Sequence, residues 1–411
     1  MEKLPREVLR EVLQYLPRSD LPSVRLLNRT LAAEAEPYLF HTIPLWIELK
    51  SLEALTGISE HPRLSQYVKE VVFSPLRFLE HKDRSLYQAG VCDALEYQSA
   101  SLSSHILRLG QHMAAYDSYR AGQRYLAANS SDVKVLSHAF GKLPRFKYLV
   151  VDYYSVIAAH RLYKAFGGYE SKPELVAWIG EYGLPVLFKA LANSKVAIST
   201  FKIGHSEALD SIWSDPDTTR DRFKSIRSSP VLHAERTISR ALCKTFDRSD
   251  DDGFRVTLRE LRIFEVSEIE LDSLTQFDID RIIVGIGTIL RWGSHIESIA
   301  IPQFGVYAPD DVPMPSMVGL FPNYGLKKLQ KLKLEGFTTT LSYFTLFFRR
   351  QGKRLKEIKF DNVIISDAEW STALLRLRDM KFPELVTFEV DFFFNVCDYI
   401  TGVTDINPMT D

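Results

Sequence analysis

The 411-residue chain contains only three cysteines, Cys92, Cys243 and Cys397. They lie far apart, so the chain has neither a CxxC pair nor the ligand spacing of a zinc finger. An odd, sparse set of thiols in a chain of this length indicates a reducing compartment, in which cysteines stay unpaired. We therefore expect a protein of the cytoplasm or nucleus.

The chain also lacks a long apolar run and an excess of charge. The longest aliphatic stretch, Ile282–Leu290, includes Gly285 and Gly287, whereas a membrane-spanning helix needs about 20 apolar residues. The start, Met1-Glu2-Lys3, does not resemble a signal peptide. Lys and Arg total 51 and Asp and Glu total 52, a net charge of -1. That balance creates no broad attraction for nucleic acid or anionic membrane, so neither is an expected partner.

The remaining composition is that of a globular protein with a sizeable core. Hydrophobic residues make up 45% of the chain and charged residues 25%, both ordinary values. At roughly 100–200 residues per domain, this length allows either several domains or one elongated array of repeats.

Residues 4–16 have the spacing of an amphipathic helix. Leu9, Leu13 and Leu16 recur at positions i, i+4 and i+7. Pro5 suits the first helical turn, where the N–H that proline lacks has no partner to lose. The run Pro17–Asp20 is expected to end this helix, and Ser19 or Asp20 to cap a second one.

The second helix is expected to carry Leu21, Val24, Leu27 and Leu31 on one side, and a third to run on to about Pro37. Three helices this short bury their apolar faces on one another only in part. Domains of this size usually depend on metal, disulfides or a partner. Some of the leucines are therefore expected to pack either on the rest of the chain, as an N-terminal cap, or on another protein.

The order and spacing of these residues resemble the F-box. The resemblance rests on Leu4-Pro5, Leu9, Leu13, Leu16-Pro17, Asp20-Leu21, Val24-Arg25, Leu27-Asn28-Arg29 and Leu31. The tail that follows resembles the fungal form of the module, with Pro37-Tyr38-Leu39-Phe40, Ile43 and Leu45-Trp46. Asn28 stands where many F-boxes have Cys, and Leu31 where many have Trp.

The resemblance implies a docking role rather than catalysis. F-box proteins bind the Skp adaptor of a cullin-based ubiquitin ligase. The chain is thus expected to be a substrate-recognition subunit that holds a protein substrate near the ubiquitin-charged enzyme. It is expected to be no enzyme and to need no cofactor. The expected adaptor-binding residues are Leu4, Pro5, Val8, Leu9, Leu13, Leu16, Leu21, Val24 and Leu27.

A second pattern, apolar-x-x-apolar-x-apolar, recurs after residue 60, and its final alternating pair suits a short strand with one buried face. The clearest copies are Leu329-Leu332-Leu334, Leu355-Ile358-Phe360 and Leu385-Phe388-Val390. Weaker copies are Val68-Val71-Phe73, Phe146-Leu149-Val151, Ile198-Phe201-Ile203, Leu258-Leu261-Ile263 and Ile296-Ile299-Ile301. Helices are expected between them at Val135–Leu143, Leu184–Ala192, Ile238–Phe246, Phe344–Gln351 and Trp370–Asp379.

The later copies are spaced roughly as in leucine-rich repeats. The last four begin at residues 296, 329, 355 and 385, and that repeat is about 20–29 residues long. The sequence therefore predicts an α/β fold, in which a three-helix F-box precedes an irregular α/β leucine-rich-repeat-like solenoid. The alternative is a two-layer α/β domain whose strands share the motif by chance. The expected division is an F-box at 1–47, a helical connecting region with the first strand unit at 48–140, the repeat-like region at 141–395 and a tail at 396–411.

Polar residues that alternate with the buried strand positions are expected to line a concave surface for a protein or peptide. They are Gln330, Lys331, Lys333 and Glu335 in one copy, and Lys356, Glu357 and Lys359 in the next. The lysines indicate some acidic character in the ligand, and a simply solvated face is the alternative. Long loops are expected at 211–230, 248–253 and 307–322.

Motifs for catalysis are incomplete. The run Gly204–Ala208 follows a strand-like segment and places Ser206 as in a GxSxG nucleophile elbow, but it lacks the final glycine. Gly285-Ile286-Gly287 begins a phosphate-binding loop, but Leu290 occupies the third glycine position. A turn after a strand is the simpler interpretation of the first.

Metal-binding motifs are incomplete as well. Asp250–Gly253 is similar to part of a calcium loop, yet the first and last ligand positions fall on Arg248 and Arg259. The histidines contain no HExxH pair, and His105 and His112, seven residues apart, are better explained as a solvated or packed pair. No metal site is expected. Two alternatives to the ligase subunit stay open: a repeat-fold scaffold outside any ligase, and a hydrolase acting through Ser206.

Overall fold

The structure, a computed structural model, describes residues 4–16, 20–74, 77–78, 84–96, 102–152, 176–177, 180–204, 252–266, 276–301, 315–321 and 326–391. The chain divides into two compact units, residues 1–258 and 259–411. Helices alternate with parallel strands in both units, which confirms the predicted α/β class. No described helix is long and apolar enough to cross a membrane.

Unit 1 begins with three short helices and continues as alternating strands and helices. Its helices are α1 (Arg6–Tyr15), α2 (Leu21–Leu27), α3 (Arg29–Leu39), α4 (Leu49–Glu60), η1 (Leu64–Gln66), α5 (Arg84–Glu96), α6 (Leu102–Asn129), α7 (Ser131–Gly141), α9 (Gly180–Ser194) and α13 (Asp252–Leu258). Its strands are β1 (Thr42–Trp46), β2 (Glu70–Ser74), β3 (Arg77–Phe78), β4 (Tyr148–Val151), β5 (Val176–Ala177) and β6 (Thr200–Ile203).

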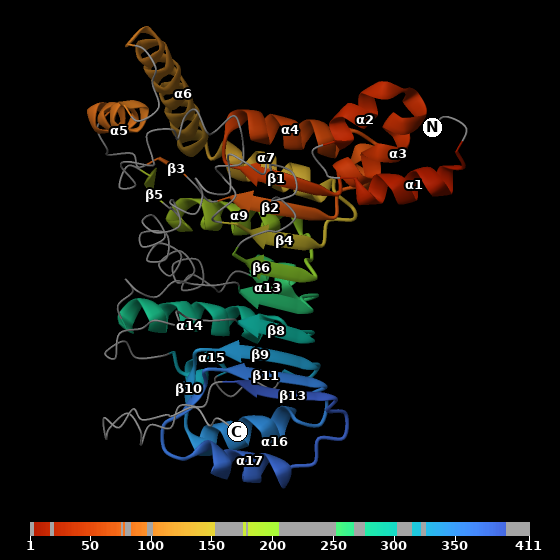
Figure 1. Ribbon diagram of the computed structural model, residues 1–411, viewed down its shortest axis with the longest axis vertical. Helices are drawn as coiled ribbons and strands as arrows, with labels where there is room; N and C mark the ends of the chain where they lie inside the picture. Colours follow the sequence, from red (N-terminus) through yellow and green to blue (C-terminus); the bar gives the residue numbers. More distant parts are fainter. Residues whose placement is uncertain are drawn as a thin grey trace, which may run out of the picture. The chain divides into compact units, whose positions relative to one another are not determined.

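The main strands of unit 1, β1, β2, β4 and β6, are parallel and follow one another in chain order. The register aligns Ile43, Val71, Leu149 and Phe201 in one row across the sheet. All four are buried, because α4, α7, α9 and α13 pack side by side in the same order (Figure 1). The strands predicted from the Val68, Phe146 and Ile198 copies are confirmed as β2, β4 and β6.

Strand β1 was not expected as a strand. Its residues repeat the strand pattern, since Phe40, Ile43 and Leu45 are spaced apolar-x-x-apolar-x-apolar. The same residues resemble the tail of an F-box, and that interpretation concealed the strand. The predicted helices at 135–143 and 184–192 are confirmed as α7 and α9, and the one at 238–246 lies outside the described residues.

Helices α5 and α6 are inserted in the chain between β2 and β4, and they pack against each other. The rings of Tyr87 and Tyr116 stack with centroids 3.9 Å apart. Arg84 forms an ion pair with Asp117 at 2.8 Å and lowers the pKa of that carboxyl, mainly through the hydrogen bond. The 28-residue α6 buries Met113, Tyr116, Tyr119 and Leu126 on one face and exposes Leu107 and Tyr125 on the other, so it carries apolar residues on both sides.

Unit 2 contains helices α14 (Gln276–Trp292), α15 (Met317–Leu320), α16 (Leu341–Gln351) and α17 (Trp370–Arg378). Its strands are β7 (Ile263–Val266), β8 (Ser298–Ile301), β9 (Lys331–Glu335), β10 (Thr338–Thr339), β11 (Glu357–Asp361), β12 (Ile364–Ile365) and β13 (Thr387–Asp391). The strands predicted from the Ile296, Leu329, Leu355 and Leu385 copies are confirmed, as are the helices at 344–351 and 370–379.

Strands β7, β8, β9, β11 and β13 of unit 2 are parallel, in chain order and in register. One row across them contains Phe264, Ile299, Leu332, Ile358 and Phe388. The first four are at most 1% exposed, whereas Phe388 is 37% exposed on the last strand. The parallel strands are thus shown within each unit, and the repeat solenoid stays a prediction.

The prediction at Leu258-Leu261-Ile263 is wrong in phase. Leu258 ends α13, and the buried residues of β7 are Phe264 and Val266, while Ile263 is 38% exposed. The true copy is Leu261-Phe264-Val266, three residues later. Exposed Ile263 was taken for a buried strand position, because the pattern accepts any apolar residue.

Candidate functional site

Helices α1, α2 and α3 enclose a small core. Leu13, Leu21 and Ala35 are its buried centre, and Leu16, Val24, Tyr38 and Leu39 pack around them. Leu9 and Leu31 are also buried, at 2% and 4% exposure. The predicted i, i+4, i+7 leucines of α1 therefore face the other two helices.

Asn28 holds the start of α3. Its side-chain Oδ1 accepts a hydrogen bond from the N–H of Leu31 at 2.8 Å, which satisfies one of the free amides at a helix start. Thus the two positions that depart from the common F-box pattern interact with each other. At α1 the prediction is corrected, because Pro5 is the N-cap rather than a first-turn residue. At α2, Asp20 occupies the predicted N-cap position but its side chain makes no capping hydrogen bond, and Ser19 lies outside the described residues.

A buried carboxylate links α3 to α1. The Glu34 side chain is 8% exposed and accepts a hydrogen bond from Arg10 Nε at 2.6 Å, with Arg6 at 3.8 Å. This hydrogen bond raises the pKa of the Arg10 guanidinium above its ordinary value. The Tyr38 hydroxyl donates to the Arg10 carbonyl at 3.1 Å, so polar contacts fix the angle between the two helices.

A second carboxylate ties α3 to the strand region. The Glu36 side chain is 5% exposed, and its Oε1 lies 3.0 Å from Arg63 Nη2, beyond α4. Its other oxygen, Oε2, is buried without a hydrogen-bond partner among the described residues. Arg63 is therefore the cation that makes this buried charge tolerable.

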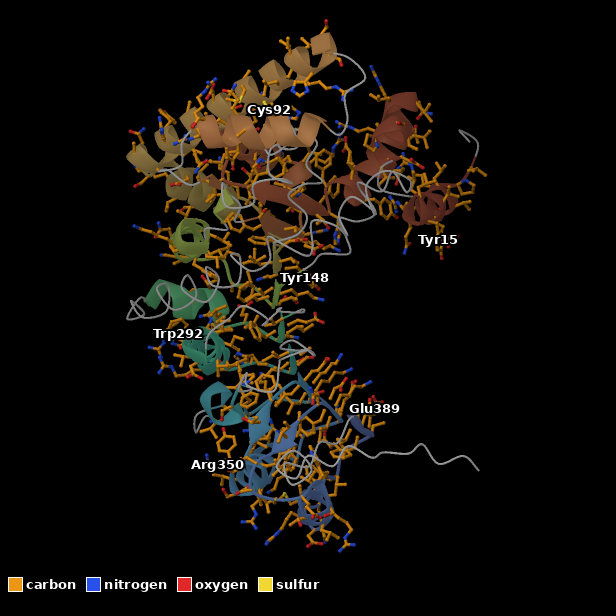
Figure 2. All side chains as sticks on the ribbon, turned by 60° about the vertical axis from the view of Figure 1, so that its left-hand side comes forward. Tyr15, Cys92, Tyr148, Trp292, Arg350 and Glu389 are labelled. Carbon is orange, nitrogen blue, oxygen red and sulfur yellow. The ribbon has the colours of Figure 1, made fainter. Side chains whose placement is uncertain are left out.

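The outer side of α1 is also apolar. Leu4, Val8, Val12 and Tyr15 recur at i, i+4, i+8 and i+11, and they are 42%, 39%, 39% and 85% exposed. Figure 2 shows Tyr15 projecting from this helix. We call these four residues the outer ridge. These residues are only partly covered by the rest of the three helices, so the row leaves apolar surface open to solvent.

The end of α2 exposes a second apolar group. Leu26 and Leu27 are 85% and 67% exposed, the highest values among the leucines of the three helices. Large apolar side chains this exposed, together with the outer ridge, give the three helices the surface of a protein-docking module.

The structure places the predicted adaptor-binding residues in three groups. Leu4, Pro5, Val8 and Leu27 are exposed, Leu16 and Val24 are partly buried, and Leu9, Leu13 and Leu21 lie in the core. The buried three support the shape of the module, and a direct contact between any of the nine and an adaptor stays a prediction. Sequence reasoning left Val12, Tyr15 and Leu26 out of the set. The outer-ridge spacing was the signal for the first two.

The exposed face of the unit 2 strands carries paired charges. Lys331 lies 2.9 Å from Glu357, Lys359 lies 3.7 Å from Glu357, and Lys359 lies 3.0 Å from Glu389. The predicted alternation with buried positions is confirmed for β9 and β11. Figure 2 shows Glu389 on the strand side of the unit, away from Arg350 of α16. The charges of Lys331 and Lys359 are largely neutralised by these glutamates, so the two lysines are poorly suited to bind an acidic ligand.

The incomplete chemical motifs gain no support. Gly285 and Gly287 lie inside α14, where the backbone forms helix rather than a phosphate-binding loop. Ser206 and most of the 248–253 loop are outside the described residues, as are the predicted loop at 211–230 and most of the one at 307–322. His105 and His112 are both half-buried on α6. Within the part of the chain that the structure describes, no cluster of His, Cys, Asp or Glu suits a metal ion.

Comparison with known families places the N-terminal helices. The model of the F-box domain matches residues 1–33, which cover α1, α2 and the first part of α3. The curated proteins include no match to the chain. An F-box domain is thus present at the N-terminus, while the fungal form of the module stays a prediction. F-box domains bind Skp adaptors in cullin ligases, and this one suggests a role as an adaptor-binding substrate receptor.

Proposed function

We propose that the chain is the substrate-recognition subunit of a Skp–cullin–F-box ubiquitin ligase. It docks the adaptor through its F-box and holds a protein substrate on the strand-containing region. The observation that carries the proposal is the F-box match at residues 1–33, on helices that fold around their own core and still expose six large apolar side chains.

The exposed apolar surface is of the size that docking requires. Full burial of a Val, Leu or similar side chain contributes about 1.5–3 kcal/mol. The outer ridge with Leu26 and Leu27 is already partly covered, so it offers on the order of 10 kcal/mol gross. Association costs roughly 4–15 kcal/mol in lost freedom. The docking surface therefore needs most of these residues, and loss of two should clearly weaken binding of the adaptor.

The substrate-holding part of the proposal rests on the parallel strands. In each unit they follow one another in chain order with matching residues in register, as expected for a leucine-rich-repeat-like arrangement. In our proposal the chain performs no chemistry, needs no cofactor and acts in the cytoplasm or nucleus. It contributes by bringing a substrate close to an enzyme that carries ubiquitin.

Substitution of the outer ridge tests the adaptor contact. Val8→Asp with Val12→Asp places two charges in the proposed interface without entering the core, because both side chains are exposed. We expect capture of purified Skp adaptor by the full chain to weaken at least tenfold, about 1.4 kcal/mol. The measurement is an equilibrium pull-down, with hydrogen exchange of α1–α3 reporting that the helices stay folded.

The matched control adds the same charge elsewhere on the helices. Gln14→Asp with Thr30→Asp changes two exposed polar residues and should leave adaptor capture within twofold. Undiminished capture by the Val8/Val12 variant would refute the assigned surface. Failure of the unmodified chain to capture any adaptor would instead favour a repeat-fold scaffold outside the ligase.

A further inference from the structure

Three segments of unit 2 are rich in basic residues. They are KKLQK at 327–331, RRQGKRLK at 349–356 and RLRDMKFPE at 376–384, with eleven Lys and Arg against two acidic residues. All eleven basic side chains are exposed. Each segment leads into a strand, β9, β11 or β13.

The three segments lie at one edge of the sheet. The strands are parallel and in register, so their N-terminal ends are neighbours. The N–H of Lys356 donates to the Gln330 carbonyl at 2.7 Å, and the N–H of Val386 donates to the Lys356 carbonyl at 2.8 Å. Arg354 Nη1 donates to the Lys327 carbonyl at 2.5 Å. With adjacent strands about 4.8 Å apart, the charges form one continuous strip, which we call the basic edge.

The other end of the same strands is acidic. Glu335, Asp361 and Asp391 align at the C-terminal ends of β9, β11 and β13. Segments 335–341 and 361–370 contain no Lys or Arg and also hold Asp367 and Glu369. Charge is therefore segregated between the two ends, although the whole chain is nearly neutral. An acidic ligand is attracted to the basic edge and repelled from the opposite one.

The fold itself uses only part of the basic charge. Helices α16 and α17 end at this edge, and their free carbonyls favour the arginines of their last turns. Arg378 also lies 3.7 Å from Asp379, and Lys331 lies 2.9 Å from Glu357, which neutralises much of its charge. Lys328, Lys353 and Lys356, in contrast, make no side-chain hydrogen bond or ion pair within the described residues. Helix ends therefore do not account for them.

We propose that the basic edge binds an acidic segment of a protein partner. The inference deepens the proposed function and rests on it in taking that partner to be a substrate. Grooves for single-stranded nucleic acid combine cations with exposed aromatic rings on which bases stack. The one aromatic residue of the three segments, Phe382, packs against Phe348 with ring centroids 5.9 Å apart. The edge thus offers cations without a stacking platform, which favours an acidic peptide.

The test uses the full chain and a fluorescein-labelled peptide of twelve alternating Asp and Glu residues. A Gln and Asn peptide and an oligodeoxythymidine of the same charge as the acidic peptide are compared with it, at about 50 mM salt, where screening is weak. The variant is Lys328→Glu with Lys353→Glu and Lys356→Glu. The matched control is Lys50→Glu with Arg124→Glu and Lys134→Glu, three exposed residues on α4, α6 and α7 of unit 1.

We expect the acidic peptide to bind, the neutral peptide not to bind, and the basic-edge variant to lose at least tenfold in affinity while the control loses less than twofold. A triple Lys→Gln variant, which removes charge without adding repulsion, should lose an intermediate amount. It also keeps the test valid if the Glu variant shows altered hydrogen exchange in unit 2.

Three outcomes would overturn the inference: no binding of the acidic peptide, equal losses in variant and control, or tighter binding of the oligodeoxythymidine with the same loss in the variant. Adaptor capture is measured on the same proteins. Normal capture without peptide binding refutes the basic edge alone, and peptide binding without any adaptor capture refutes the proposed ligase role alone.

Discussion

Neighbouring residues of α1 have opposite roles. Leu9 and Leu13 are 2% exposed, while Val8 and Val12, one position earlier in each case, are 39% exposed. An aspartate at Leu9 or Leu13 would put a charge in the core of the three helices, where it has no cation partner, and would unfold them. Such a variant loses adaptor capture for a reason unrelated to the contact surface. The exposed pair therefore gives the informative experiment.

The capping role of Asn28 leads to a prediction at a single residue. Asn28→Ala removes the acceptor of the Leu31 N–H and should cost about 1 kcal/mol of α3 stability. Hydrogen exchange of the 28–40 segment measures it as faster exchange under native conditions. Asn28→Ser keeps a capping oxygen and should recover most of the loss. Equal exchange in the Ala and Ser variants would mean that the cap contributes little.

The F-box leucines could be predicted from the sequence. The structural role of Asn28, which stands where many F-boxes have Cys, could not. An Asn three residues before Leu31 has the spacing of a helix cap, yet it was seen only as a replacement for Cys. Periodicity also could not separate buried from exposed sides of α1, because both sides are apolar. Which side faces α2 and α3 depends on tertiary packing, and local spacing contains no information about that.

At the level of elements, two glycines in helices should respond oppositely to substitution. A Cβ on Gly287 of α14 would lie 3.0 Å from the Gly319 carbonyl oxygen and 3.2 Å from that of Leu320. Overpacking of this kind costs about 1–3 kcal/mol. A Cβ on Gly57 of α4 would meet nothing within 4 Å, so Gly57→Ala should stabilise by about 0.5–1 kcal/mol.

Chemical denaturation of the two Ala variants, followed by hydrogen exchange within each unit, checks this pair. Gly287→Ala should lower the stability of unit 2, and Gly57→Ala should raise that of unit 1. A stabilising effect of Gly287→Ala would show that α15 moves away from α14 at little cost, and that the close approach of the two helices is not required.

The acidic ends of the unit 2 strands predict a pH dependence. Burial, together with the neighbouring Asp391, raises the pKa of Asp361 above its ordinary value. A group whose pKa is raised by folding favours the folded state below its unfolded pKa, about 3.9, and loses that contribution as pH rises through the folded pKa. Asp361→Asn should therefore stabilise unit 2 at pH 7 and have little effect near pH 3.

Denaturation of the Asp361→Asn variant and the unmodified chain at both pH values measures this difference. Glu384→Gln, at an exposed residue of the opposite end, is the control and should change stability at neither pH. A constant difference between Asp361→Asn and the unmodified chain across the range would contradict the proposed cause.

The strand elements were more predictable than the helices. Strands with one buried face share the apolar-x-x-apolar-x-apolar pattern. It is present at β2, β4, β6, β8, β9, β11 and β13. Strand β1 was missed because its apolar pattern, Phe40, Ile43 and Leu45, overlaps the residues that resemble the F-box tail. The long α6 falls within 48–140, which was predicted to be helical but without bounds for individual helices. Its buried residues Met113, Tyr116, Tyr119 and Leu126 share one face, while exposed Leu107 and Tyr125 lie on the other side, so apolar residues on both sides obscured the periodicity.

For the molecule as a whole, removal of the N-terminal helices separates the two leading hypotheses. Deletion of residues 1–40 should abolish adaptor capture and leave binding of the acidic peptide to unit 2 unchanged. Hydrogen exchange of β1 and β2 should stay slow, because α4, which packs on β1, and β4, which pairs with β2, remain. Rapid exchange of these strands would show instead that the three helices are a structural cap, as the scaffold hypothesis holds.

The division of the chain was harder to predict than its elements. Local patterns suggested boundaries at 47, 140 and 395, and these stay predictions. The structure has compact units meeting at residue 258. A strand motif indicates only that a short segment has one buried face. The limits of a compact unit depend on contacts between segments that lie far apart in the sequence.

The contact between Glu36 and Arg63 has a consequence for protein engineering. F-box modules invite transplantation, in which residues 1–40 are fused to a different binding region to redirect a ligase. Here the module would take along Glu36, whose side chain is 5% exposed in the full chain, and leave behind its cation Arg63, which follows α4 in the sequence. Where the new binding region covers Glu36 without supplying a cation, the unpaired charge costs about 3–5 kcal/mol. A working chimera would therefore carry residues through Arg63, or replace Glu36 with an apolar side chain of similar length.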